Sequence, residues 1–353
     1  MIITESQGKL GADMQETRTL LVTGGAGFIG SNFILYWLKK YPESKIINLD
    51  ALTYAGNLAN LRSIQNYPNY TFVEGSITNK ELVDNIMDDV DAVVHFAAES
   101  HVDRSILDPG IFLQTNVIGT HILLESALTN NVQHFHHIST DEVFGSLPLN
   151  TPEAQFSETT PYDPRSPYSA SKASSDHLVR AYGETYGLSY TITNCSNNYG
   201  EYQFPEKLIP LAITNIMDGL KVPVYGDGMQ VRDWLYVQDH CTAIDLVLHA
   251  DKSSNTYVVG GLTEDVPNIE IVKMILKIMG KGEDMIEFVT DRPGHDKRYS
   301  VNWSKIKTEL GWKPSVSFEE GLEKTIHWYQ ENRHWWEPLK AANQEFFKKN
   351  YSK

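Results

Sequence analysis

The 353-residue sequence predicts an α/β fold, a doubly wound parallel sheet followed by a smaller C-terminal lobe. In the first half, short apolar runs alternate with segments whose apolar positions have helical spacing. This alternation is typical of a parallel sheet covered by helices on both faces. After about residue 190, Pro and Gly become denser and short segments interrupt the alternation. We therefore expect a polar N-terminal extension over 1–18, the sheet domain over 19–190, to which some later segments return, and mainly the second lobe over 191–353.

The elements of the sheet domain can be placed from the apolar runs. Strands are expected at TLLVTG (19–24), KIINLD (45–50), YTFVEGS (70–76), DAVVHFA (91–97) and HFHHIST (134–140). Helices are expected between them at 30–42, 79–89 and 111–130, and amphipathic helices in the second half at 268–280 and 318–332. Because ligands bind doubly wound sheets outside the carboxyl ends of the strands, we expect the second lobe to pack over that edge.

Composition and charge exclude several classes of protein. The net charge of −15 argues against a nucleic-acid surface, because phosphate backbones attract clustered Lys and Arg. The sequence has no apolar stretch near the roughly 18 residues that a membrane helix needs, and its N-terminus lacks the pattern of a signal peptide. The two cysteines, Cys195 and Cys241, exclude a disulfide framework and a multi-cysteine zinc site. We expect a cytoplasmic protein without a nucleic-acid or membrane partner.

The segment VTGGAGFIG places Gly24, Gly27 and Gly30 at intervals of three, directly after an expected strand. Asp50 follows 20 residues after Gly30, at the end of the next expected strand. This arrangement is typical of a Rossmann dinucleotide site, because a Cβ at these glycines would keep a pyrophosphate from the N–H groups at the helix start. Asp50 can bind the adenosine ribose hydroxyls and would repel a 2′-phosphate. The sequence therefore predicts NAD as the cofactor, rather than NADP.

Tyr168 and Lys172 stand four residues apart at the start of a helical pattern. This spacing puts both side chains on one face of a helix. A phenol with a pKa near 10 is a poor base at neutral pH, but a nearby ammonium and a positively charged nicotinamide ring would favour the phenolate. In isolation such a pair is usually a surface feature. Beside a dinucleotide site, it indicates proton transfer.

Thr140, Asp141 and Glu142 stand side by side directly after an expected strand. They can form a plain turn leaving the sheet, or an acid and a base at the rim of an active site. Two carboxyl groups this close would push their pKa values apart, so that one could stay protonated. The triplet alone leaves both interpretations open.

Together with these residues, the motifs STDEVFG, SHVDRSI, NNYGEYQFPEKLIP, VPVYGDGMQVRDWLYVQDH and DRPGHDKRY resemble the extended short-chain dehydrogenase/reductase family over residues 19 to about 335. The resemblance implies an NAD-dependent hydro-lyase acting on dTDP-glucose in deoxysugar (rhamnose-type) nucleotide biosynthesis. Carbon 4 would be oxidised, water lost across carbons 5 and 6, and hydride returned to carbon 6. By resemblance, Asp141 is the acid, Glu142 the base, and Thr140 binds the carbon 4 oxygen beside Tyr168.

The resemblance also implies two sets of binding residues. Cofactor contacts are expected from Gly24, Gly27, Phe28, Ile29, Gly30, Asp50, Thr53, Ser76, Ile77, Ala97, Ala98, Ser100, Thr115, Tyr168, Lys172 and Asn198. Substrate contacts are expected from Ser100, His101, Thr140, Asn197, Glu206, Lys207, Leu208, Pro223, Val224, Tyr225, Arg232, Asn268, Arg292, His295, Arg298 and Tyr299. The three arginines of this set would supply local positive charge for the diphosphate. Ser76 stands where the family commonly has an aspartate that meets the adenine amino group, and a hydroxyl can still accept a hydrogen bond.

Other features of the sequence bear on metal binding and on rival functions. Period-two alternation in HFHHIS puts His134 and His136 on one face and His137 on the other, so no metal site is expected.

The rival functions are a UDP-sugar 4-epimerase, another nucleotide-sugar dehydratase and a non-catalytic NAD-binding protein. Asp141 and Glu142 speak against the epimerase, and the intact proton-transfer residues against the non-catalytic protein. The resemblance further implies a homodimer formed through the helix of Tyr168 and Lys172 and the 111–130 helix.

Overall fold

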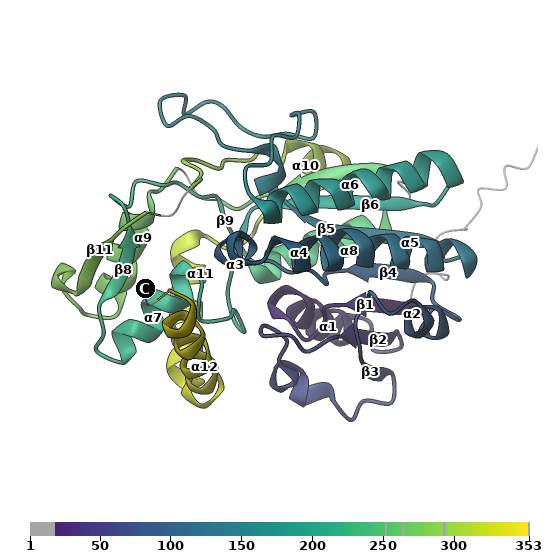
Figure 1. Cartoon of the computed structure of the whole chain (residues 1–353), viewed down its shortest axis with the longest axis horizontal. Helices are drawn as coiled ribbons and strands as arrows, with labels where there is room; N and C mark the ends of the chain where they lie inside the picture. Colours follow the sequence, from purple (N-terminus) through teal and green to yellow (C-terminus); the bar gives the residue numbers. More distant parts are fainter. Residues whose placement is uncertain (1–17, 251–252, 263–264, 292–293, 352–353) are drawn as a thin grey trace, which may run out of the picture.

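A computed structural model describes residues 18–250, 253–262, 265–291 and 294–351. Most of the expected N-terminal extension, residues 1–17, lies outside the described residues, as does Arg292. The described chain forms a larger domain around one sheet, and a smaller lobe beside it that contains β8, β11, α7, α9, α11 and α12 (Figure 1).

The larger domain is built on a seven-stranded sheet in the order β10-β6-β5-β4-β1-β2-β3, with every neighbouring pair parallel. Its strands are β1 (Thr19–Thr23), β2 (Lys45–Asp50), β3 (Tyr70–Glu74), β4 (Ala92–His95), β5 (His134–Thr140), β6 (Tyr190–Cys195) and β10 (Asn255–Val259). The strand order reverses between β1 and β4. A crevice at this switch point is where doubly wound sheets bind ligands, and the predicted fold class is confirmed.

Helices cover both faces of this sheet, because alternate strand residues point to opposite sides. In β1, Leu21 packs in the core beneath α2 (Lys80–Ile86), α5 (Thr120–Thr129) and α6 (Pro167–Tyr186). Leu20 and Val22 pack in the opposite core, beneath α1 (Phe28–Lys40) and α8 (Val237–His249). The remaining elements of this domain are η1 (Leu58–Ile64), α3 (Val102–Leu107), α4 (Pro109–Phe112), η2 (Leu113–Gly119), η3 (Asp141–Phe144) and α10 (Ser304–Leu310).

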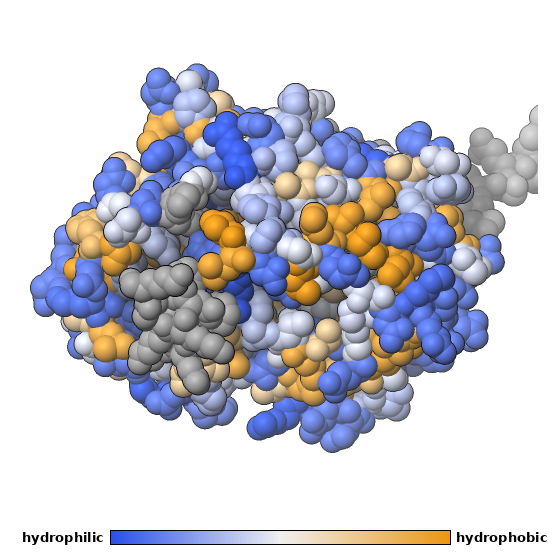
Figure 2. All heavy atoms as spheres, viewed as in Figure 1, coloured by the Kyte–Doolittle hydropathy of each residue, from blue (hydrophilic) through white to orange (hydrophobic). Residues whose placement is uncertain are grey.

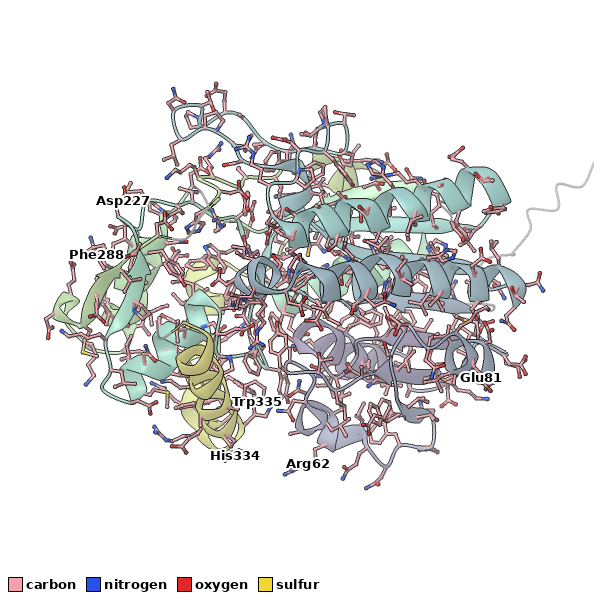
Figure 3. The ribbon with its side chains drawn as sticks, in the orientation of Figure 1. Arg62, Glu81, Asp227, Phe288, His334 and Trp335 are labelled. Atoms are coloured by element: carbon pink, nitrogen blue, oxygen red, sulfur yellow. The ribbon has the colours of Figure 1, made fainter. Side chains whose placement is uncertain are left out.

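The smaller lobe has its own apolar core, to which Ile213, Ile271 and Trp336 contribute. Its elements are α7 (Leu208–Met217), β8 (Val222–Tyr225), α9 (Asn268–Ile278), η4 (Glu283–Met285), β11 (Ile286–Val289), α11 (Phe318–Glu331) and α12 (Arg333–Tyr351). β8 pairs with β11, and β7 (Asn197–Tyr199) pairs with β9 (Trp234–Tyr236). The two parts meet where Trp335 Nε1 of α12 donates to Asn60 Oδ1 of η1 at 2.8 Å; Figure 3 labels Trp335 on α12.

The structure refines the expected elements in two places. The helix expected over 111–130 is divided into α4, the π-helical η2 and α5. After residue 190 the chain returns to the sheet domain, contributing β6, α8, β10 and α10. The expected division at residue 190 allowed for such returning segments, and the division itself stays a prediction. The second lobe itself is interrupted by these returning segments.

Candidate active site

One cavity of about 1070 Å³ runs along the carboxyl edge of the sheet and into the smaller lobe. Its wall includes the glycine turn after β1, Asp50 at the end of β2 and Thr140 at the end of β5. The opposite side is formed by residues of the smaller lobe, among them Tyr225 and Asn268. The cavity therefore lies where strand order and lobe packing together predict a ligand site.

The glycine turn leaves no room for side chains on the protein side. A Cβ on Gly24, whose φ is +70°, would lie 2.6 Å from the backbone N of Ala97, and one on Gly30 would lie 2.4 Å from the Gly24 carbonyl oxygen. At Gly27, by contrast, a Cβ would meet only the Gly24 oxygen within 4 Å, at 3.2 Å. The backbone at Gly27 is therefore open toward the cavity that it lines.

This turn fits the diphosphate of a dinucleotide. Helix α1 begins at Phe28 with Gly27 as its N-cap, and no side chain caps it. Its first N–H groups consequently have no intrahelical partner and are available to an anion. Asp50 lies beside them, with Oδ2 accepting from Ala26 N at 2.9 Å and Oδ1 from Leu52 N at 2.8 Å. Burial raises the pKa of Asp50, and these two backbone hydrogen bonds oppose that shift.

Tyr168 and Lys172 are fixed by the start of α6. Ser166 caps this helix in a capping box with Ser169, which sets both catalytic candidates on the first turns facing β5. Lys172 Nζ donates to the Ile138 carbonyl oxygen at 2.8 Å. Burial lowers the pKa of Lys172 to about 8. Burial also raises the pKa of Tyr168 well above its ordinary value, and a hydrogen bond with Thr140 opposes this rise.

The triplet at the end of β5 begins a single 3₁₀ turn. Thr140 Oγ1 accepts from the backbone N–H of Glu142 at 3.2 Å and donates to Asp141 Oδ1 at 3.4 Å. Glu142 lines the cavity, whereas Asp141 is fully buried beside it. Burial first, and then the charges of Glu142 and Asp233, raise the pKa of Asp141 well above its ordinary value. A carboxyl group in this environment is held in the protonated form, as a proton donor requires.

The structure brings almost all of the expected binding residues together. Every residue expected to contact the cofactor lines the cavity. The expected substrate residues that also line it are Ser100, His101, Thr140, Asn197, Glu206, Lys207, Leu208, Pro223, Val224, Tyr225, Arg232, Asn268, His295 and Tyr299. Their individual contacts with ligands stay predictions.

Arg298 is the exception among the described residues. It does not line the cavity, and its side chain is buried. Its Nε donates to Asp265 at 2.7 Å, and its remaining N–H groups donate to the backbone carbonyls of Thr151, Pro152 and Ala154. The donors of Arg298 hold the 151–154 loop in this structure, and its expected contact with the diphosphate stays a prediction. Arg232 does face the cavity, with its guanidinium 4.3 Å above the Tyr299 ring.

Sequence reasoning missed a cluster that bridges the two sides of the cavity. The Arg104 guanidinium lies 3.7 Å from the centre of the Tyr54 ring and 3.6 Å from Glu206 Oε2. Tyr54 follows β2, Arg104 lies on α3, and Glu206 precedes α7. Lys340 of α12 also lines the cavity and pairs with Asp218 at 2.8 Å. Arg104 was visible in the SHVDRSI motif, but only the tertiary structure shows its partners.

The histidine-rich strand has the faces that alternation predicts. His134 and His136 both contact the Thr191 hydroxyl, and His137 lies on the other face beside Asp176. Within the described ranges, no group of three or more His, Cys, Asp or Glu side chains is placed to hold a metal ion. The helices that the structure describes include none long and apolar enough to cross a membrane.

Comparison with known proteins gives consistent results. The family model of GDP-mannose 4,6 dehydratase matches residues 21–325. The chain is 51% identical to a dTDP-glucose 4,6-dehydratase of Streptomyces niveus, over 92% of this chain and 96% of that one. A crystal structure of a dTDP-glucose 4,6-dehydratase from Streptomyces venezuelae, with NAD and TYD bound, has a TM-score of 0.88 and 50% identity, covering 91% of this chain and 99% of that one.

More distant solved structures share the same architecture. UDP-glucose 4-epimerase from Thermotoga maritima, solved with UDP-glucose, has a TM-score of 0.82 at 29% identity, covering 89% of this chain and 99% of that one. The architecture alone thus does not separate dehydratases from epimerases, whereas the higher identity to the dehydratases does. The chain therefore belongs to the GDP-mannose 4,6 dehydratase family, together with the dTDP-glucose 4,6-dehydratases that share about half of its residues.

Proposed function

We propose that this chain is an NAD-dependent hydro-lyase that converts dTDP-glucose into dTDP-4-keto-6-deoxyglucose, a step of deoxysugar nucleotide biosynthesis. The observation that carries this proposal is the pair of adjacent carboxyl groups, Asp141 and Glu142, at the same strand end as Thr140 and beside Tyr168. The names of the relatives that share about half of the sequence support the same reaction.

NAD would be held by the glycine turn, by Asp50 and by Lys172, and when bound it supplies a hydride acceptor for carbon 4 and a hydride donor for carbon 6. Tyr168 removes the proton of the carbon 4 hydroxyl, while Thr140 holds the same oxygen. The nearby ammonium of Lys172 stabilises the phenolate that this step requires, because an opposite charge favours the ionised form. The carbonyl formed at carbon 4 makes the carbon 5 hydrogen acidic.

Elimination then needs one base and one acid. Glu142 takes the proton from carbon 5, and Asp141 gives its proton to the carbon 6 oxygen, so that water leaves and a double bond forms between carbons 5 and 6. The raised pKa of Asp141 supplies the protonated partner. Because Asp141 is buried beside the cavity wall, its side chain must turn toward the sugar when substrate binds. Catalytic hydrogen bonds are often completed only in the substrate complex.

An epimerase with the same fold needs only the oxidation and reduction at carbon 4, and no carboxyl pair.

The proposed function is tested by incubating the protein with dTDP-glucose, UDP-glucose and GDP-mannose in parallel. A 4-keto product, read by its absorbance in alkali, is expected from dTDP-glucose first. UDP-galactose formed from UDP-glucose would identify an epimerase, and a preference for GDP-mannose another dehydratase. If the protein binds NAD but converts none of these sugars, the result would indicate a non-catalytic NAD-binding protein.

We further propose that the chain works as a homodimer. Five apolar side chains of α3, α4 and η2 are 42–53% exposed within a stretch of 13 residues: Ile106, Leu107, Ile111, Leu113 and Ile118. Figure 2 shows apolar surface gathered over α4 and α5. A contiguous apolar face rimmed by polar side chains is the kind of surface that a second copy covers.

The expected cytoplasmic location also stays a proposal, supported by the free, buried thiols of Cys195 and Cys241.

A further inference from the structure

Beneath Tyr168 and Lys172 lies a buried polar cluster that the proposed mechanism does not use. Asp176 follows Lys172 by one turn of α6, and its Oδ1 lies 3.2 Å from Nε2 of His137 on β5. The same nitrogen of His137 lies 3.4 Å from Lys172 Nζ. Asp176 and His137 are both fully buried, so this row of three side chains leads from the interior of the domain to the cavity that Lys172 lines.

The carboxylate of Asp176 is held from three directions. Its Oδ2 accepts hydrogen bonds from Ser139 at 2.8 Å, Tyr162 at 2.7 Å and Asn194 at 3.2 Å. These donors come from β5, from the segment before α6 and from β6. They leave Oδ1 facing His137. Burial alone would raise the pKa of Asp176, but the contacts with His137, Lys172 and Tyr162 hold it below its ordinary value, so the group carries a negative charge.

His137 sits between two charges as a neutral ring. Burial, and then the charge of Lys172, lower its pKa to about 4. Among the described residues, its Nδ1 has no hydrogen-bond partner, so Nδ1 is best left unprotonated and the proton placed on Nε2. That tautomer places the N–H beside Asp176 Oδ1 at 3.2 Å, and because the same nitrogen lies 3.4 Å from Lys172 Nζ, the carboxylate and the ammonium both lie against one atom of the ring. Lys172 is held in turn by the Ile138 carbonyl at 2.8 Å.

A buried ammonium needs a nearby negative charge, because burial favours its neutral form. We propose that Asp176, acting across His137, is a positioning residue for Lys172, which keeps the ammonium charged and directed toward Tyr168 and the cofactor pocket. This inference rests on the proposed function for the role of Lys172. To the residues of the proposed mechanism it adds Asp176, which touches neither substrate nor cofactor. The ionisable groups around Lys172, from β4, β5, β6 and α6, are His95, His137, Cys195, Tyr168, Asp176 and Arg180.

The test follows the formation of bound NADH, which depends on Tyr168 and Lys172 but not on the elimination residues. The parent is the Asp141→Asn/Glu142→Gln variant, which lacks the two elimination residues and should therefore accumulate the NADH that is measured. After mixing with dTDP-glucose at a series of pH values, NADH absorbance is expected to fall as the pH rises through the pKa of Lys172. Adding Asp176→Asn should move this fall to lower pH by about one unit or more, since a nearby opposite charge shifts a pKa by roughly that amount.

A matched control separates positioning from stability. Asp245 of α8 is also a buried carboxylate with several partners, Tyr36, Lys40, Tyr41 and His249, and it lies against α1 on the other face of the sheet. Adding Asp245→Asn to the same parent should lower the melting temperature but leave the pH dependence unchanged. Asp176→Glu, which restores the charge, should move the fall back toward its original pH.

A second measurement does not need turnover. In the otherwise unmodified protein, we compare how much NAD remains bound after gel filtration as the pH is raised. The release of NAD should begin at a lower pH in Asp176→Asn than in Asp245→Asn. If Asp176→Asn does not fold, Asp176→Ser removes the same charge and leaves room for a water among the donors. An unchanged pH dependence and unchanged NAD retention, with only a lower melting temperature, would overturn the inference. A parent that never forms NADH from dTDP-glucose would instead refute the proposed function, and NAD retention would still decide the role of Asp176.

Discussion

The carboxylate of Asp50 accepts a hydrogen bond of 2.9 Å from the backbone N–H of Ala26, which ties the acid at the end of β2 directly to the glycine turn. The proposed ribose and diphosphate sites are therefore parts of one structure, and a change at Asp50 acts on both. Its other oxygen, Oδ1, accepts from Leu52 N at 2.8 Å, so the carboxylate orients the segment that follows β2 as well.

Asp50→Ala should accordingly weaken NAD binding by about 10- to 100-fold, the loss expected when a hydrogen bond to a charged group is removed. Asp50→Asn, which keeps one acceptor oxygen, should lose less. Calorimetric titration of the cofactor-free protein with NAD and with NADP measures both effects. A preference of the unmodified protein for NADP would contradict the proposed role of Asp50.

Gly27 and Gly30 should respond differently to the same added methyl group. In Gly30→Ala the Cβ would lie 2.4 Å from the Gly24 oxygen and 2.8 Å from the Gly25 Cα, so the turn itself must shift and the melting temperature should fall. In Gly27→Ala the Cβ meets protein only at 3.2 Å and otherwise projects into the cavity. This variant should fold with a melting temperature near that of the unmodified protein, yet retain little NAD after gel filtration.

The proposed dimer can be tested on its apolar face. Leu113→Glu and Ile118→Glu each place a charge on a side chain that is already 42–53% exposed, so the isolated chain should tolerate them. Because a charge at the centre of an apolar interface must be desolvated, both variants should favour the monomer at micromolar concentration. Light scattering after gel filtration gives the mass. Leu220→Glu, a similarly exposed position in the smaller lobe, is the control and should stay dimeric.

The first βαβ unit and the proton-transfer pair were predictable because local signals mark them. The glycine turn, Asp50 and the spacing of Tyr168 and Lys172 each depend on residues close together in sequence. β6 was not predicted, because its polar residues break the apolar pattern. The structure shows why they are tolerated: Thr191 contacts His134 and His136, and Asn194 donates to Asp176.

Arg298, by contrast, makes contacts in the structure that the sequence did not predict. An arginine in a recognisable motif was expected at the diphosphate, yet its donors meet carbonyl oxygens almost 150 residues earlier in the chain. Backbone carbonyls leave no trace in the identity of the residues that carry them, so this role is invisible in the sequence. The same holds for the row of Lys172, His137 and Asp176, whose members share a face only once β5 and α6 are packed together.

Asp245 should make stability depend on pH in the acid range. Although burial raises its pKa, hydrogen bonds from His249, Lys40, Tyr36 and Tyr41 lower it from 3.8 to about 2. A carboxyl group whose pKa is lower in the folded than in the unfolded state stabilises the fold above its ordinary pKa, and this stabilisation is lost as the pH falls toward 2. Asp245→Asn should therefore cost about 1–2 kcal/mol at neutral pH, after allowance for solvent screening. The difference from the unmodified protein should shrink between about pH 4 and 2 in urea unfolding measurements.

The last prediction concerns the carboxyl pair at the end of β5. If Asp141 and Glu142 serve elimination while Tyr168 serves oxidation, the two steps should be separable by mutation. Asp141→Asn/Glu142→Gln keeps shape and hydrogen-bonding capacity but removes the proton donor and the base, and the loss of one such group typically costs about 10²–10⁴-fold in rate. The double variant should accumulate enzyme-bound NADH while forming little 4-keto product. Tyr168→Phe should block NADH formation itself.

Solvent isotope gives an independent measurement on the unmodified protein. In D₂O, deuterium should appear at carbon 5 of the product, because that proton leaves to a side chain and is replaced from exchanged solvent. Carbon 6 should receive the hydrogen of carbon 4 without dilution by solvent, because it moves as hydride inside a closed site. Mass spectrometry of product made from substrate labelled at carbon 4 distinguishes the two positions. If the double variant turned over at the normal rate, Asp141 and Glu142 would form only a structural turn, and the dehydratase proposal would have to be abandoned.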